Sequence, residues 1–323
     1  MLKHLAAVAA MSLAVAPALA GAAAPAGSRL GAWNRPVAAA PGPLARSFTF
    51  TTLDNQADPT FNQLLGINDA GTIVGYFGSG ATGHPNKGYR LVRPYGQSNY
   101  INENYPGSAQ TQVVAINNMH DTAGFWVDGS NKNFGFVAWN GVFTSFRDPH
   151  TGTGTVNQVL GLNDAGMAVG FYTDGNGLNH GFELNQATGQ FTAVVPTGGS
   201  NVTAAGINDN GDVTGFATAA SGAVVGFLLR GNTFSEFAFP GAMSTTPFGI
   251  NKRDQIVGAY IDASGLTHGF LLSNPLNHAK WQTIDDPNGI GTTLLNGLND
   301  RDELVGFYVD AAGNTDGFLA QPQ

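Results

Sequence analysis

The stretch between Gly66 and Phe77 combines groups from which a phosphate or cation site could be built. It reads GINDAGTIVGYF, with three glycines, an Asn-Asp pair and a short apolar run. A phosphate-binding loop needs a Lys and a Ser or Thr after its glycines and a helix behind them, and neither is indicated here. Asn and Asp oxygens suit calcium. A calcium loop and a plain β-turn are therefore the alternatives that this stretch leaves open.

Calcium is the weaker of these two interpretations. The copy NDNGD at 208–212 gathers oxygen ligands, but the twelve-residue spacing and the terminal Glu of a calcium loop are missing. In another copy Lys252 replaces the acid. Asn, Asp and Gly accept the left-handed backbone angles of tight turns. The stretch is predicted to be a hairpin turn, with no cofactor and no metal site assigned and calcium kept only as a weak alternative.

Motifs for hydrolytic catalysis do not occur in the chain. There is no H-E-x-x-H pair, no cysteine and no G-x-S-x-G elbow. His180 and His268 occupy the same position before Gly-Phe, which favours a structural role. The carboxylates of Asp285 and Asp286, like that of Asp148, precede a proline, and a charged turn explains them better than a glycosidase-type pair. No catalytic residue is predicted.

Residues that break the repeat pattern are the candidates for contacting a ligand or a partner. An insertion after the first stretch is basic and aromatic, and exposed Arg and Tyr favour recognition of anions, sugars or a protein surface. Departures in the second and fifth units are expected on the same rim as Asp69. The candidates are Lys87, Arg90, Arg93, Tyr95, His120, Lys252 and Arg253.

The elements that position these residues repeat six times. GINDAGTIVGYF returns at intervals of 43 to 49 residues, with its asparagine at Asn68, Asn117, Asn163, Asn208, Asn251 and Asn299. A second phrase such as HGFEL or HGFLL follows each copy, and a third strand-like phrase ends near proline, as in FTSFRDP. Each unit thus holds about four short strands in roughly 45 residues, which is typical of a propeller blade.

The two ends of the repeat region predict how the ring is completed. The last unit stops at GFLAQPQ without a third phrase, and the missing strand appears before the first unit, at 47–59. The fold predicted for residues 46–323 is all-β: a six-bladed β-propeller of four-stranded blades, closed by pairing of the N-terminal strand with the C-terminal blade. The repeated asparagine is expected to bond a buried backbone group. The glycine in the middle of the strand after each turn is expected to admit a close neighbour, and we call it the second glycine of the copy. These glycines are Gly75, Gly124, Gly170, Gly215, Gly258 and Gly306.

The N-terminal residues indicate export. Residues 1–20 carry a short positive region, an apolar core and ALA before Gly21, which is the pattern of a signal peptide. Residues 21–45 are rich in Ala, Pro and Gly and are interpreted as a flexible or extended leader. The rest has no long apolar run, so no membrane span is expected. An extracellular or periplasmic location is predicted.

The composition of the chain bears on how the fold is stabilised and on which class of partner it excludes. Only 11% of the residues are charged, the formal net charge is −8, and the chain contains 0 cysteines. A fold of this size must then be held by its core without disulfides. The acidic balance argues against nucleic acid, which requires a basic face.

The paired phrases resemble the HAF-type extracellular repeats of bacterial exported proteins. The resemblance covers nearly all of residues 46–323, because both phrases recur in order six times. One departure is the middle position, where this chain has Gly in place of Ala, as in HGF at 180 and 268. The resemblance implies an extracellular, propeller-like repeat protein and carries no catalytic residue with it.

The function that the sequence favours is a secreted binding or structural module with an unidentified extracellular ligand, polymer or protein surface. The alternative is a propeller enzyme, a hydrolase or lyase, with its site at the mouth of the central channel. A surface-layer or matrix component is a third class and predicts self-association. An enzyme should gather non-repeated His, Asp, Glu or Arg at one end of the channel, whereas a binding module should not.

Overall fold

The computed structural model of the protein describes residues 28–31, 33–34, 46–154 and 156–323. The predicted signal peptide at 1–20 lies outside the described residues, as does most of the predicted leader. The described part consists of β-strands, turns and two single-turn 3₁₀ helices, η1 (Gln97–Asn99) and η2 (Pro149–Thr151). It contains no helix long and apolar enough to cross a membrane.

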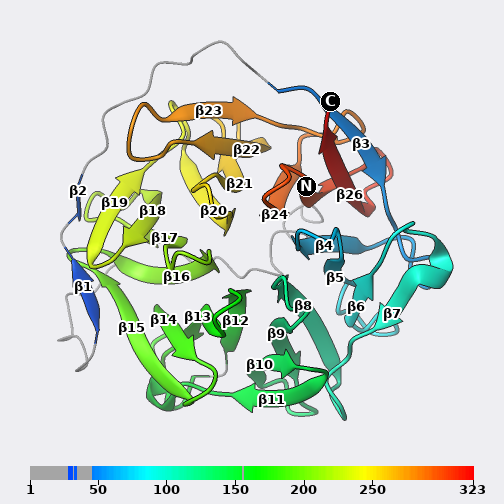
Figure 1. Cartoon of the computed structure of the whole chain (residues 1–323), viewed down its shortest axis with the longest axis horizontal. Helices are drawn as coiled ribbons and strands as arrows, with labels where there is room; N and C mark the ends of the chain where they lie inside the picture. Colours follow the sequence, from blue (N-terminus) through cyan, green and yellow to red (C-terminus); the bar gives the residue numbers. More distant parts are fainter. Residues whose placement is uncertain (1–27, 32, 35–45, 155) are drawn as a thin grey trace.

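Six four-stranded antiparallel units are arranged around a ring, as Figure 1 shows. Blade 1 comprises β4 (Asn62–Ile67), β5 (Ile73–Phe77), β6 (Lys87–Leu91) and β7 (Tyr100–Asn102). Blade 2 comprises β8 (Gln110–Ile116), β9 (Thr122–Val127), β10 (Asn133–Trp139) and β11 (Val142–Phe146). Blade 3 comprises β12 (Asn157–Leu162), β13 (Met167–Thr173), β14 (Asn179–Asn185) and β15 (Gln190–Pro196). Blade 4 comprises β16 (Ser200–Ile207), β17 (Val213–Thr218), β18 (Val224–Arg230) and β19 (Thr233–Phe237). Blade 5 comprises β20 (Ser244–Ile250), β21 (Ile256–Ile261), β22 (Thr267–Ser273) and β23 (Lys280–Thr283). Blade 6 comprises β24 (Thr293–Leu298), β25 (Leu304–Val309), β26 (Thr315–Pro322) and β3 (Phe48–Thr52).

Blade 6 combines both ends of the repeat region. Strand β3 pairs antiparallel with β26, from Thr52 opposite Phe318 to Phe48 opposite Pro322. This is the pairing that the sequence predicts. The blade is an open four-stranded sheet, and within the described residues no sheet closes on itself.

Each blade turns one side chain of its innermost strand into the channel. The register between the two inner strands shifts at the same place in every blade, for example between Leu64 and Gly66 in blade 1 and between Ala204 and Gly206 in blade 4. Such a bulge redirects one side chain of the strand. The redirected residues are Leu65, Val114, Leu160, Ala205, Phe248 and Asn296. The channel is thus narrowed by side chains that are apolar in five blades and an amide in the sixth.

The second glycine of each repeat lies where a side chain would not fit. A Cβ on Gly75 would stand 2.1 Å from the Gln63 carbonyl oxygen and 3.0 Å from the Tyr89 hydroxyl. The equivalent Gly258 faces a carbonyl at 2.3 Å and a Phe270 ring carbon at 2.8 Å. The predicted close approach is therefore confirmed, and the neighbour is both a backbone and an aromatic ring.

The core lies between neighbouring blades. One buried cluster joins Val169 and Val194 of blade 3 to Val202 and Phe227 of blade 4. The aromatic residue of each second phrase is at most 1% exposed, and burying a ring of this size removes a large apolar area from water. The aromatic residues are Tyr89, Phe136, Phe182, Phe227, Phe270 and Phe318.

The predicted leader contributes two short strands to the outside of the ring. Strand β1 (Arg29–Gly31) pairs parallel with β15, and β2 (Trp33–Asn34) pairs parallel with β19. These strands lie along the outer edges of blades 3 and 4 (Figure 1). The remaining leader residues, 21–27, 32 and 35–45, lie outside the described residues.

Candidate functional site

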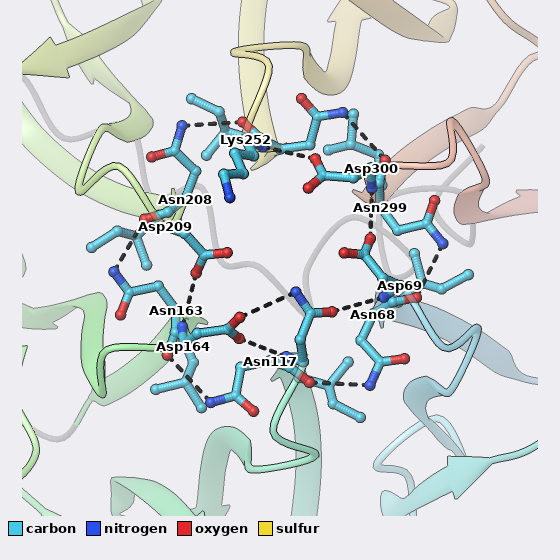
Figure 2. A pocket seen from close by; sticks show the side chains of 18 residues that line it. Asn68, Asp69, Asn117, Asn163, Asp164, Asn208, Asp209, Lys252, Asn299 and Asp300 are labelled. Atoms are coloured by element: carbon cyan, nitrogen blue, oxygen red, sulfur yellow. Dashed lines mark hydrogen bonds between the residues drawn. The ribbon is translucent and has the colours of Figure 1, made fainter.

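Six asparagines, one from each blade, link neighbouring blades around the channel mouth (Figure 2). Each Nδ2 donates to the backbone oxygen of the next asparagine, over 3.0 to 3.3 Å, and the last, Asn299, donates to the first, Asn68. Each Oδ1 accepts the backbone N–H four residues later, as Asn68 does from Thr72 at 2.9 Å. This asparagine ring confirms the predicted structural role of the repeated residue.

The residue after each asparagine forms a second circle, which we call the mouth ring. Its members are Asp69, Asn118, Asp164, Asp209, Lys252 and Asp300. In five blades the backbone N–H of one member donates to the Oδ1 of the next, over 2.7 to 3.0 Å. The turns hold these acceptors in place because each is bonded to the backbone of a neighbouring blade.

Lys252 interrupts the mouth ring. An ammonium group has no acceptor, so the Asp209 N–H does not find there the carboxylate or amide oxygen that its counterparts find. Figure 2 shows the Lys252 side chain directed into the ring, together with Asp209 and Asp300. The mouth therefore presents four carboxylates and one amide against a single ammonium group.

The space inside the mouth ring is small. It encloses a cavity of about 80 Å³, and one water needs roughly 10–15 Å³ of such volume. Beneath it lie an isoleucine and leucine layer and then the glycine or alanine that precedes each of these residues, such as Gly66 before Ile67. There the backbones come close: a Cβ on Gly297 would be 2.8 Å from the Leu65 carbonyl oxygen. The mouth suits one small polar group with a few waters.

The electrostatics of the mouth favour a positive ligand. Burial raises the pKa of Asp209, and the carboxylates of Asp164 and Asp300 act in the same direction. The hydrogen bond from the Asp164 N–H and the charge of Lys252 act against this rise. A further cation would lower the cost of keeping Asp209 ionised.

The stretch at 208–212, for which calcium is the weak alternative, uses its side chains for contacts within the protein. Among the described residues, no three or more His, Cys, Asp or Glu side chains are grouped so that they could hold a metal ion. In the stretch at 208–212, Asn208 and Asp212 bond within the turn, and the Asp212 carboxylate also pairs with Arg230 at 2.9 Å. These contacts are those of a β-turn, which is the structure predicted for that stretch.

The predicted arginines are paired with acids of the same molecule. Arg90 binds Glu103 at 2.7 Å, and Arg93 binds Glu303 of blade 6 at 2.6 Å. The Arg93 guanidinium also lies over the Tyr95 ring, and the Tyr95 hydroxyl donates to the Gly71 carbonyl. Their charges thus serve contacts within and between blades.

His120 and Arg253 lie on the turns of the asparagine ring, on the rim predicted for them, but they do not line the mouth. Arg253 pairs with Asp302 and donates to Gln255, and a ring nitrogen of His120 lies 3.3 Å from the Asn68 amide nitrogen. Lys87 begins β6, at the end away from the turn at 68–72. Of the seven candidates, Lys252 is the one that lines the channel mouth.

The repeated histidines belong to the outer hairpins. His180 binds Asp174 at 3.0 Å and stacks on Tyr172. His268 lies between Asp262 and Asp285; although burial acts to lower its pKa, these two carboxylates raise it above the usual value. Asp285 thus pairs with His268, and this histidine has the structural role predicted for it.

Sequence reasoning missed the acidic mouth. The signal was visible: the residue after the repeated asparagine is Asp in four copies out of six. It passed as part of a turn because a carboxylate at that place also suits a turn. That all six positions face one small space follows only once the blades are arranged in a ring.

The fold and the ring of turns define the chain as a β-propeller protein. No family model matches the sequence, and no curated protein matches it either. Solved structures with the same fold include TolB from Acinetobacter baumannii, with a TM-score of 0.52, 9% identity and coverage of 83% of this chain and 66% of that chain.

Two further solved structures have a similar arrangement of strands. The fucose-specific lectin from Aleuria aurantia has a TM-score of 0.52 and 12% identity, covering 80% of this chain and 91% of that chain. The gluconolactonase XC5397 from Xanthomonas campestris has a TM-score of 0.50 and 10% identity, covering 85% and 90%. At such identities the likeness concerns the fold alone.

Proposed function

We propose that this chain is an exported β-propeller binding module, similar to the HAF-type repeat proteins, whose mouth ring receives a small organic cation. The ligand class is an ammonium or guanidinium group, either free or at the end of a partner's side chain. The observation that carries the proposal is the mouth itself: backbone-anchored oxygens from five blades surround a space of about 80 Å³.

An enzymatic role has less support from the same place. The mouth is lined by Asn, Asp, one Lys and aliphatic residues. General acid–base or nucleophilic catalysis needs a base and a reacting group in contact, with pKa values set apart by their surroundings. The predicted cations that could have joined such a set, Arg90, Arg93 and Arg253, are paired with other acids.

Export rests on the N-terminal pattern. Residues 1–20 have the composition of a signal peptide, and the chain contains 0 cysteines. Both leave the protein free to act in an extracellular or periplasmic setting.

The test uses n-butylammonium as the probe and neutral n-butanol as its matched control, with backbone amide chemical shifts as the readout. Butylammonium should shift the N–H signals of the mouth, including Asp164 and Asp300, and butanol should not. Asp209→Asn retains the Oδ1 that accepts from Asp164 and removes one charge. We expect a loss of affinity of about fivefold, since one charge at this range contributes about 1 kcal/mol.

Two further variants make the result specific. Lys252→Asn removes the one cation of the mouth ring, so binding should strengthen by about the same factor. Asp128→Asn changes the same net charge in the outer turn of blade 2, where Asp128 accepts from Ser130 and Lys132, and it should leave binding unchanged. Equal shifts with butanol, or equal losses in the Asp128 and Asp209 variants, would refute a cation site at the mouth.

A further inference from the structure

Glu183 departs from the pattern of its repeat position. It follows the phenylalanine of the second phrase, where three other blades have leucine and one has valine, and it is only 6% exposed. The equivalent residues are Arg90, Val137, Leu228, Leu271 and Leu319. Burying a carboxylate is costly unless a cation and hydrogen bonds accompany it. A single buried acid in one of six similar blades therefore calls for a specific partner.

The partner comes from the leader. The Arg29 Nη1 pairs with the Glu183 carboxylate. The Arg29 Nε donates to the Gly231 carbonyl oxygen at 2.9 Å, and Nη2 donates to the same oxygen. Gly231 is in the turn between β18 and β19 of blade 4. One guanidinium therefore bridges a buried acid of blade 3 and a turn of blade 4.

The backbone around Arg29 is recognised as well. Strand β1 runs parallel to β15, with Arg29 opposite Val194 and Gly31 opposite Pro196, and the Thr197 N–H donates to the Gly31 carbonyl at 2.9 Å. A Cβ on Gly31 would lie 2.3 Å from the Asn232 carbonyl oxygen. The edge thus accepts an extended segment with an arginine and, two residues later, a glycine.

We propose that the outer edges of β15 and β19, with Glu183 and the Gly231 carbonyl between them, form a peptide-binding site for an extended segment of the pattern Arg-x-Gly, and that strands β1 (Arg29–Gly31) and β2 (Trp33–Asn34) of the same chain are its resident ligand. This edge site is separate from the channel mouth. A second peptide of the same chemistry would have to displace the leader to bind there.

A cleavable leader tests the site in the full-length chain. A specific protease sequence is placed within residues 35–45, and the nicked protein is analysed by size exclusion and native mass spectrometry. The N-terminal fragment should remain bound after nicking, and an excess of a labelled peptide of residues 27–36 should displace it. A peptide with Arg29→Ala should bind at least about tenfold more weakly, because charge-assisted bonds to a buried carboxylate are lost.

Changes on both sides establish the contact. A peptide with Arg29→Lys should also bind more weakly, since an ammonium group cannot serve Glu183 and Gly231 in the fork geometry of a guanidinium. In a Glu183→Gln protein the preference for the arginine peptide over the alanine peptide should shrink severalfold, while an Asp128→Asn protein should retain it. The peptide substitutions stay informative even where Glu183→Gln impairs folding, because they leave the propeller unchanged.

Three results would overturn the proposal. The fragment could leave the nicked protein as fast as an Arg29→Ala fragment does. The alanine peptide could bind as tightly as the arginine peptide. Finally, the intact chain could form dimers whose leaders exchange between copies, which would replace the cis assignment by a contact between molecules.

Discussion

The repeated asparagine bonds two blades with one buried side chain. Asn163 donates to the Asn208 carbonyl at 3.1 Å and accepts from the Met167 N–H at 3.0 Å, while only 4% exposed. Asparagine is suited to this position because its amide carries a donor and an acceptor on a short side chain. Aspartate would keep the acceptor and lose the donor.

Asn163→Ala should lower the free energy of unfolding by about 2–4 kcal/mol, because it leaves buried backbone groups without partners on both sides of the interface. Urea denaturation measures the change. Asn210→Ala is the matched control, since the exposed Asn210 also donates to a backbone oxygen of the next blade; it should cost about 0.5 kcal/mol or less. Equal effects of the two substitutions would mean that the asparagine ring contributes no more than a surface contact.

At the scale of elements, a half-buried acid, Asp54, follows strand β3. The Asp54 Oδ1 accepts from the Gly317 N–H of β26 at 3.0 Å. Burial raises the pKa of Asp54 to about 7; the Gly317 bond opposes this, and the charge of Asp316 adds to it. The folded protein therefore holds this proton more tightly than the unfolded chain does, whose Asp has its usual pKa of 3.8.

The stability that Asp54 contributes is accordingly complete below about pH 4 and is lost as the pH rises through 7. Asp54→Asn keeps the oxygen that accepts from Gly317 and does not ionise. Its free energy of unfolding should fall less steeply between pH 4 and pH 8 than that of the unchanged protein, measured by urea denaturation at each pH. Asp128→Asn should follow the unchanged protein. Parallel curves for the Asp54 variant and the unchanged protein would contradict the raised pKa of Asp54.

At the scale of the whole molecule, the ends of the repeat region meet in blade 6. The Gln323 N–H donates to the Ser47 carbonyl at 3.0 Å, at the end of the antiparallel pair formed by β26 and β3. Such neighbouring ends are in the position of a two-residue hairpin connection. The strand that precedes blade 1 in the chain is thus part of the sheet of blade 6.

A circular permutant tests this arrangement. Residues 1–46 are removed, Gln323 is joined to Ser47 through Asn-Gly, and the chain is opened at the exposed turn at Gly107 between blades 1 and 2. Cooperative unfolding should be retained, within about 2 kcal/mol of the parent truncated at the same residue, because insertion and opening at exposed turns are tolerated. The control is the pair of fragments that results when the chain is opened at Gly107 and Gln323 is left unjoined to Ser47. Loss of cooperative unfolding in the joined permutant alone would contradict the pairing of β3 with β26.

What the sequence determined is local or repeated. Strand and turn chemistry within about 45 residues set each blade, and six copies set their number; the asparagine and the second glycine could be interpreted because their environment recurs. The N-terminal strand was predicted from a missing phrase at the other end.

The tertiary structure decided which residues far apart in the sequence meet in contacts that do not recur from blade to blade. Arg93 meets Glu303 and Arg29 meets Glu183 across separations of 210 and 154 residues, and no pattern in one sequence pairs such charges. The mouth ring likewise exists only when six turns face one axis. Charge is visible in a sequence, but its partner and its burial depend on distances in space, because electrostatic energy falls with separation and rises as water is excluded.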